Sequence, residues 1–256
     1  MKPARADETY RLADGVVALA PGIAWLPAGR TLLVADAHLA YEDVVGGALP
    51  LWSTTEIVAT IGVAAERMRA REVVFLGDIV HGARMSEGAV GRVRAGLDDL
   101  RARMQVTLVA GNHEGRSRAF AVLGETVDAC ERDGWLLVHG DGAALLGRRT
   151  IIGHVHPSLH LGGGKTVPAF VASEALVVVP AMTPYSPGLD LCSDDFAAVL
   201  GAWSVRRRDA HVVAASADRV FPFGSLDALR AQLRRPARPD RPSPRRFIRR
   251  LRPDAS

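Results

Sequence analysis

The sequence is poor in cysteine and lysine, and it has no long uninterrupted apolar run. Its two cysteines, Cys130 and Cys192, belong to no CxxC pair or Cys/His cluster. This spacing argues against a disulfide framework and favours buried thiols in a reducing, cytoplasmic compartment. No segment approaches the ~18 apolar residues of a membrane helix, so we expect no membrane span. A chain of 256 residues is long enough for one large α/β domain with a substantial core.

An early apolar stretch, residues 15–26, follows several basic residues and faintly resembles a secretory signal. Asp14 and Pro21 interrupt that pattern. A two-strand hairpin made of residues 16–20 and 23–26 accounts for the same side chains, and we favour it.

Positive charge is concentrated at the C-terminus. Residues 234–256 hold nine arginines and two aspartates, a local charge of +7, while the whole chain carries only +4. The preceding residues therefore carry a net −3. Arginine outnumbers lysine thirty to two across the chain, which indicates a bias of genome composition more than a nucleic-acid partner. Because the terminal segment is also rich in proline, we predict a domain over residues 1–233 and a disordered basic tail over 234–256.

Three short apolar segments alternate with two helical patterns in the first half of the chain. We predict buried strands at 31–35, 73–76 and 106–109, and helices at 54–70 and 86–103. Strands joined in this way lie parallel to one another. Ser53 and Glu56 have the spacing of a capping box for the first helix.

The second half has short strand-like segments with little room between them for helices. This spacing predicts a mainly antiparallel sheet. The expected strands are residues 126–129, 135–138, 150–152, 169–172, 177–179, 197–203 and 211–215.

Polar side chains that bind metals follow one predicted strand after another. A single aspartate or histidine in such a place is usually a turn residue or a structural imidazole. Its recurrence at successive strand ends predicts one shared site, because ligands of open α/β sheets bind beyond the carboxyl ends of the strands. The residues are Asp36, His38, Asp78, Asn112, His113, His139, His154 and His156.

Oxygen and imidazole donors without thiolate suit Mn²⁺, Fe, Zn²⁺ or Mg²⁺ better than a structural zinc site. This number of donors is enough for two ions with one shared carboxylate. Two-metal sites hold their ions about 3.5–4 Å apart and stabilise in-line displacement at phosphorus. We therefore expect two divalent ions, with Mn²⁺ favoured.

The blocks D-x-H, G-D, G-N-H-E, H and G-H-x-H, in this order between Leu33 and His156, closely resemble the calcineurin-like metallophosphoesterase superfamily. The forms LGD-x-x-H and GHVHP, with VPAF at 167–170 and VPAMTPYSPGLDL at 179–191, resemble the bacterial ligase-associated DNA-damage-response metallophosphoesterases and their archaeal relatives. The core motifs span residues 31–191. One departure is in the first block, DAHLAYE, where Ala37 and Ala40 replace the usual Leu and Gly.

The resemblance implies a four-layer αββα sandwich of two mixed β-sheets flanked by helices. It implies that Asp36, His38 and His156 hold one metal, that Asn112, His139 and His154 hold the other, and that Asp78 bridges them. His113 would face the phosphate without binding metal, and Glu114 would orient it. The nucleophile would be a hydroxide shared by the metals.

The expected function is hydrolysis of a phosphodiester, with nucleic acid, DNA or RNA, as the favoured substrate. The resemblance also implies DNA repair partners such as a ligase or helicase. Two alternatives remain open. One is a small-molecule phosphodiesterase or phosphatase, for example one that acts on a cyclic nucleotide; the other is a non-catalytic scaffold, which the phosphate-facing His113 argues against.

Overall fold

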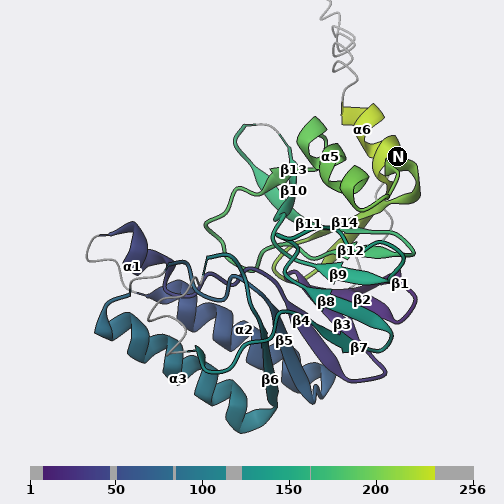
Figure 1. Ribbon diagram of the computed structural model, residues 1–256. Coiled ribbons are helices and arrows are strands. Elements are labelled where there is room, and N and C mark those ends of the chain that lie inside the picture. Colours follow the sequence, from purple (N-terminus) through teal and green to yellow (C-terminus); the bar gives the residue numbers. More distant parts are fainter. Residues whose placement is uncertain (1–7, 47–50, 83–84, 114–122, 162, 234–256) are drawn as a thin grey trace, which may run out of the picture.

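Two β-sheets stack face to face between two layers of helices (Figure 1). The computed structural model describes residues 8–46, 51–82, 85–113, 123–161 and 163–233. Within these residues the sheets are mixed and the helices lie on their outer sides, as in the four-layer αββα sandwich that the family resemblance implies. Glu114 and the basic tail at 234–256 lie outside the described residues.

The first sheet has six strands in the order of the chain, and its second half is parallel. The antiparallel hairpin of β2 and β3 contains the early apolar stretch, so this stretch is part of the folded sheet. β4, β5 and β6 are parallel, because the helices α2 and α3 connect them. The elements of this half are β1 (Thr9–Ala13), β2 (Val16–Leu19), β3 (Ile23–Leu26), β4 (Thr31–Val34), α1 (Tyr41–Val45), α2 (Trp52–Met68), β5 (Glu72–Leu76), α3 (Glu87–Arg103) and β6 (Gln105–Val109).

The second sheet is less antiparallel than expected. Its order is β13-β10-β11-β12-β9-β8-β7, and β14 pairs with both β11 and β15. β8, β9 and β12 are parallel neighbours within this sheet. A long loop between β8 and β9 returns the chain to the same end of the sheet, and β9 pairs on its other side with β12, which comes later in the chain. The elements are β7 (Cys130–Arg132), β8 (Trp135–Val138), β9 (Thr150–Ile152), β10 (Pro157–His160), β11 (Thr166–Ala172), β12 (Leu176–Val178), β13 (Leu189–Asp190), α5 (Asp194–Ala202), the 3₁₀ helix η1 (Arg207–Asp209), β14 (His211–Ala215), β15 (Val220–Ser225) and α6 (Leu226–Leu233).

Two of the strand predictions in this half are wrong. Residues 197–203 belong mostly to helix α5, which begins after Ser193; the Ser193 hydroxyl accepts a hydrogen bond from Phe196 N. This serine and the two aspartates that follow it are a helix start signal that outweighs the apolar run. Residues 126–129 do not form the expected strand. The strand in this region is β7, which begins at Cys130, and Val127 makes an isolated bridge to Val109.

Alternating side chains of the parallel strands divide the core into layers. On β4, Leu32 and Val34 pack against α2 and α3, whereas Leu33 packs between the two sheets. Trp135 of β8 is fully buried in that middle layer. On the other outer face, Phe196 and Leu200 of α5 cover the second sheet. This alternation follows from the two-residue period of a strand, and it leaves the strand ends free to carry polar groups.

The start of helix α2 is held by a residue from another helix. The capping-box prediction is wrong, because α2 begins at Trp52 and no side chain of its own caps it. Instead the buried carboxylate of Glu42 accepts hydrogen bonds from Ser53 N at 2.9 Å and Ser53 Oγ at 2.7 Å. A carboxylate at this end also complements the helix dipole. The contact fixes α1 against α2.

A partly buried ion pair joins the two sheets at the opposite ends of their strands. Glu72 of β5 accepts hydrogen bonds from Arg132 Nε at 2.8 Å and Arg132 Nη2 at 2.7 Å, and also from Thr107 Oγ1 at 2.6 Å. Burial raises the pKa of Glu72, but the hydrogen bonds and charge of Arg132 outweigh burial and lower this pKa below its ordinary value. The network therefore stabilises the fold at neutral pH, and that stabilisation is lost as the pH falls through the lowered pKa.

We expect Arg132→Leu to lower the free energy of unfolding by about 3 kcal/mol at pH 7, because it leaves a buried carboxylate unpaired. The difference from wild type should shrink in acid, where Glu72 becomes neutral in both proteins. Urea denaturation at pH 7 and at lower pH measures both effects. Arg148→Leu is the control, since its pairing with Glu131 is exposed and should change stability by less than about 1 kcal/mol.

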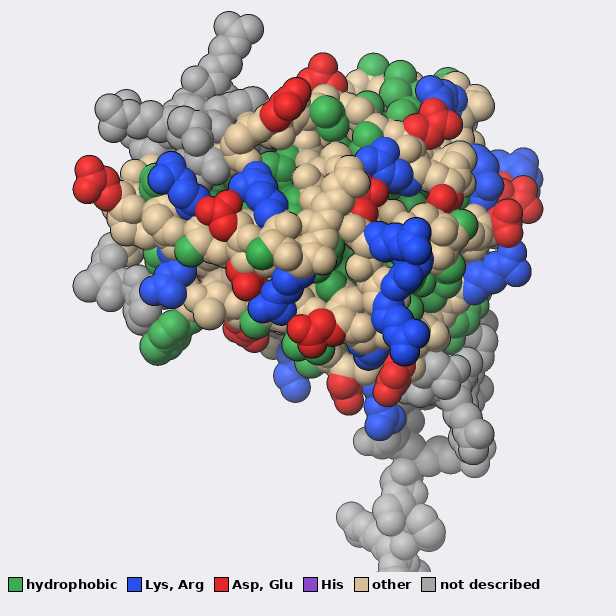
Figure 2. Space-filling view, turned by 90° about the horizontal axis from the view of Figure 1, so that it is seen from below, with side chains coloured by type: hydrophobic (Ala, Val, Ile, Leu, Met, Phe, Trp, Pro, Cys, Tyr) green, Lys and Arg blue, Asp and Glu red, His purple; other side chains and the backbone are tan. Residues whose placement is uncertain are grey.

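The outer helical layer carries charges of both signs. Seen from below, positive and negative side chains are interspersed over the described part of this face (Figure 2). Several of them pair, such as Arg103 with Asp99 and Glu66. Among the described helices, none is long and apolar enough to cross a membrane.

Candidate metal centre

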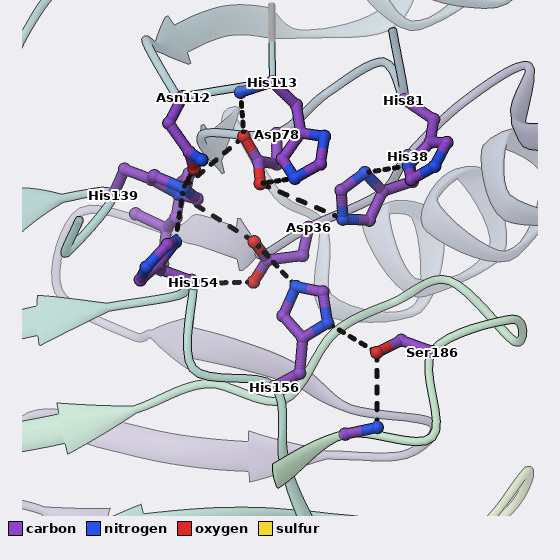
Figure 3. Close-up of polar contacts among 12 residues, drawn as sticks. Asp36, His38, Asp78, His81, Asn112, His113, His139, His154, His156 and Ser186 are labelled. Atoms are coloured by element: carbon purple, nitrogen blue, oxygen red, sulfur yellow. Dashed lines mark hydrogen bonds and ion pairs between the residues drawn. The ribbon is translucent and has the colours of Figure 1, made fainter. Parts of the chain in front are cut away.

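The predicted donor residues meet at one edge, where strands of both sheets end. Asp36 and His38 follow β4, Asp78 follows β5, and Asn112 and His113 follow β6. From the second sheet, His139 follows β8, and His154 and His156 follow β9. The carboxyl ends of these parallel strands point the same way, so residues more than a hundred positions apart face one another (Figure 3). The structure brings together all eight residues predicted from the strand ends.

The backbone conformation of the donor residues directs their side chains into the site. Asp36, His38, Asp78, His154 and His156 all have positive φ, between 44° and 60°. This left-handed conformation is costly for residues with a side chain and is concentrated at functional sites. It bends the chain back directly after each strand, so that consecutive polar side chains point inward.

Gly77 is required by the packing of His139. A Cβ at Gly77 would lie 2.4 Å from His139 Nδ1, far inside contact distance, and φ there is +81°. The close approach lets His139 Nδ1 lie 2.8 Å from the carbonyl oxygen of Leu76. Any side chain at position 77 would therefore displace His139.

Two groups of donors share one carboxylate. Ligand atoms of Asp36, His38, Asp78 and His156 all lie within 4.8 Å of one another. Ligand atoms of Asp78, His139 and His154 form a second group within the same limit. Asp78 belongs to both, as a bridging residue would.

Asn112 lies beside the second group. Its Oδ1 is 3.0 Å from His139 Nε2, and His154 Nδ1 is 3.1 Å from the same nitrogen. Asp78 Oδ1 lies 3.4 Å from it. Four donors thus converge on one point.

One buried oxygen in the first group has no hydrogen-bond partner within the described residues. Asp36 Oδ1 is fully buried, and His156 Nε2 lies 3.2 Å from it. Its companion Oδ2 accepts a hydrogen bond from His154 N at 2.8 Å. An unpaired buried carboxylate oxygen is costly, and a divalent cation between it and the imidazole would satisfy both lone pairs. The donor set therefore fits a metal ion.

Three histidines of the two groups, His38, His139 and His156, have an outer nitrogen that already contacts another group. Leu76 O accepts from His139 Nδ1, and Ser186 Oγ lies 2.7 Å from His156 Nδ1. His81 Nδ1 lies 3.1 Å from His38 Nδ1. With these Nδ1 atoms engaged, Nε2 of His38, His139 and His156 presents its lone pair to the site, which is the usual arrangement around metal-binding histidines. His154 instead faces the second group through Nδ1.

Electrostatics at the site favour a cation. Burial lowers the pKa of His38 to about 3, against the opposing charge of Asp78. Burial likewise lowers the pKa of His139, but the hydrogen bond and charge of Asp78, with Asp36, raise it to about 9. Burial raises the pKa of Asp78, and hydrogen bonds and charge from His139 and His113 more than reverse that effect. The two carboxylates thus favour a positive charge at His139.

His113 takes a different position from the histidines of the two donor groups. Its backbone nitrogen donates to Asp78 Oδ1 at 2.9 Å, while its side chain is 42% exposed and its Nε2 lies 3.8 Å from Asp78 Oδ2. His113 also lies within 4.8 Å of His38 and His81, which form a third possible donor group with it. In that group, His38 and His81 already contact each other through their Nδ1 atoms. An exposed imidazole at the rim of the two groups can donate to a bound substrate.

Ser186 is a site residue that the strand-end pattern missed. It lies on the loop after β12, whose backbone is anchored by Met182 N on Ala35 O and Thr183 N on Asp36 O. Its hydroxyl accepts from Gly188 N at 3.2 Å and holds His156. The sequence signal that could have pointed to Ser186 is the segment 179–191, which resembles a segment of the family. Ser186 does not directly follow a strand there, so the strand-end pattern did not select it.

We expect Ser186→Ala to weaken metal binding about 10–100-fold, because His156 loses the contact that orients its ring. Titration of metal-free protein with Mn²⁺ measures the affinity. Ser216→Ala is the matched control, since Ser216 lies in an exposed turn where it bonds Asp218 and Arg219. Equal affinities for the two variants would contradict a positioning role.

The fold is similar to that of a solved nuclease. The Pseudomonas putida nuclease MPE superposes with a TM-score of 0.62 over 86% of this chain and 99% of its own, at 22% sequence identity. The chain has the metallophosphoesterase fold. This finding agrees with the fold that the sequence resemblance implies.

A phosphoesterase from E. coli, Yfce, is a more remote structural match. Its TM-score is 0.37 at 17% identity, over 61% of this chain and 82% of its own. No protein-family model and no curated protein sequence matches the chain.

Proposed function

We propose that this chain is a phosphoesterase dependent on two divalent metal ions, that it cleaves phosphodiesters, and that its substrate is nucleic acid. The observation that carries the proposal is the pair of donor groups that share Asp78. The similarity in fold to a nuclease supports the choice of substrate.

The positions of the residues support the roles that the family resemblance implies. Asp36, His38 and His156 would hold one ion, and Asn112, His139 and His154 would hold the other, with Asp78 between them. When bound, two such ions lower the pKa of water and neutralise the charge that develops at phosphorus. Mn²⁺ suits this mixture of oxygen and imidazole donors.

His113 would act on the substrate itself. Its exposed side chain lies beside Asp78, where it can donate from a ring nitrogen to a phosphate oxygen. A donor aimed at charge that develops in the transition state accelerates the reaction more than it strengthens ground-state binding. Glu114 would orient His113, as the family resemblance implies.

The test is purified protein with Mn²⁺, assayed in parallel on bis-p-nitrophenyl phosphate, p-nitrophenyl phosphate and single-stranded DNA and RNA. We expect cleavage of the diester and of at least one nucleic acid, and slower cleavage of the monoester. Cleavage of small esters alone would favour a small-molecule phosphodiesterase or phosphatase. No cleavage of any substrate by protein that holds two ions would overturn the proposal and leave the scaffold alternative.

The basic tail should contribute long-range attraction to a polyanion, because residues 234–256 carry +7 and the preceding residues −3. Each phosphate neutralised on duplex DNA contributes about −0.9 to the slope of log K against log salt. We expect a chain that ends at Leu233 to bind DNA more weakly and with a flatter slope. Turnover of a small diester should be the same in both proteins, since no proposed ligand is removed. Equal salt slopes would mean that the tail does not bind DNA.

A further inference from the structure

Four aromatic rings run in a row from the metal centre toward the surface. We call His113, His81, Tyr41 and Tyr185 the ring ladder. His113 and His81 stack at 5.2 Å between centroids and 21° between planes, and His81 contacts Tyr41 at 4.3 Å. Tyr41 and Tyr185 stack at 4.6 Å and 13°. The ladder therefore begins at the residue proposed to face the phosphate and ends on an exposed tyrosine.

Tyr185 is held in place from two sides. Its hydroxyl donates to Glu42 Oε1 at 3.1 Å, and Glu42 is itself buried and bonded to Ser53. The chain just before it is anchored by Thr183 N on the backbone oxygen of Asp36. Because these contacts already restrict the ring, a ligand that stacks on it loses little side-chain entropy.

The ring nevertheless remains open to solvent. Tyr185 is 43% exposed although Tyr41 covers one of its faces at a nearly parallel angle. The hydrogen bond from the Tyr185 hydroxyl to buried Glu42 and the contact of one ring face with Tyr41 would be enough to hold the loop in place. An exposed aromatic ring on the loop that also carries Ser186 is the kind of group on which bases of single-stranded nucleic acid stack.

The local charge favours a base over a phosphate at this place. The carboxylate of Glu42 lies directly behind the tyrosine hydroxyl. A negative charge at this distance repels a phosphate and leaves the stacking of an uncharged ring unaffected. The polyanionic backbone would therefore pass over the metal centre while a base turns toward Tyr185.

We propose that Tyr185 is a stacking site for a nucleobase of the substrate, next to the phosphate that is cleaved. The proposal rests on the proposed function and adds to it the class of group that the site recognises. The nucleobase can belong to a nucleic-acid chain or to a small nucleotide diester, and the experiment distinguishes these sources.

The test compares Tyr185→Leu with Tyr185→Phe on three diesters. Methyl p-nitrophenyl phosphate has no base, thymidine 5′-(p-nitrophenyl phosphate) has one, and single-stranded DNA has many. We expect Tyr185→Leu to lower the ratio of kcat/KM for a base-containing diester to kcat/KM for the base-free diester by about tenfold. Tyr185→Phe keeps the ring and should largely preserve that ratio. Tyr10→Leu, a change at a distant tyrosine that contacts His211, is the matched control and should keep the ratio of wild type.

The pattern of losses assigns the source of the base. A lower ratio for both base-containing diesters places the base within the nucleotide that is cleaved, and a lower ratio for DNA alone places it on a neighbouring nucleotide. Equal losses on all three substrates, or none, would overturn the proposal, because the ring would then serve only the loop.

A binding measurement keeps this proposal separate from the proposed function. Single-stranded DNA that contains 2-aminopurine should lose fluorescence on binding wild type and Tyr185→Phe in EDTA, and much less on binding Tyr185→Leu. If wild type cleaves nothing, the proposed function fails while this readout still decides whether a base stacks on Tyr185. Identical quenching by all three proteins would overturn the stacking site.

Discussion

Asp78→Asn is expected to abolish phosphodiester cleavage and to reduce the bound metal from two ions to one or none. Asp78 belongs to both donor groups, so its negative charge would offset the repulsion between two dications. An amide keeps the shape of the side chain but cannot supply that charge. Elemental analysis of purified protein and turnover of bis-p-nitrophenyl phosphate with added Mn²⁺ measure both effects.

The control for this variant is Asp98→Asn, which makes the same chemical change on the exposed face of α3, where Asp98 pairs with Arg101. It should retain both ions and full turnover. If Asp78→Asn retained near-normal turnover with saturating metal, a shared carboxylate would not be needed, and the two-ion assignment would be wrong.

His113→Ala is expected to retain both ions and to lose about 10²–10³-fold in kcat. His113 is exposed at the rim of the donor groups, and a donor aimed at developing charge contributes about that much to the rate. Elemental analysis, circular dichroism and turnover at saturating substrate separate the loss of chemistry from the loss of metal or fold.

His160→Ala is the matched control, because His160 is an exposed histidine at the end of β10 and lies outside the donor groups. It should behave as wild type. Loss of an ion from His113→Ala would show instead that His113 is a ligand, and the roles of the donors would have to be reassigned.

The errors in the predicted elements have two different physical causes. Residues 197–203 look like a strand by composition, yet Ser193 and the aspartates after it start a helix whose face, Phe196 and Leu200, is buried on the second sheet. The expected cap of α2 at Ser53 is replaced by Glu42 from another helix. At α2 a neighbour in space thus replaced the local cap, whereas at α5 a local helix start signal outweighed the apolar composition.

The sequence by itself determined the strand ends and the chemistry placed on them. Glycine, aspartate, asparagine and histidine after short apolar runs identified all eight donor residues that the structure brings together, because both the end of a buried strand and a ligand side chain are local properties. The role assigned to Glu114 and the disorder expected of the tail stay predictions, since both fall outside the described residues.

Only the tertiary structure decided which donors share an ion and what surrounds them. Asp36 accepts from His154, and His156 is held by Ser186, across separations that no local pattern encodes. The ring ladder likewise joins His81 to Tyr185 through Tyr41. Such contacts depend on how two sheets and a loop pack against each other, and packing is a property of the whole chain.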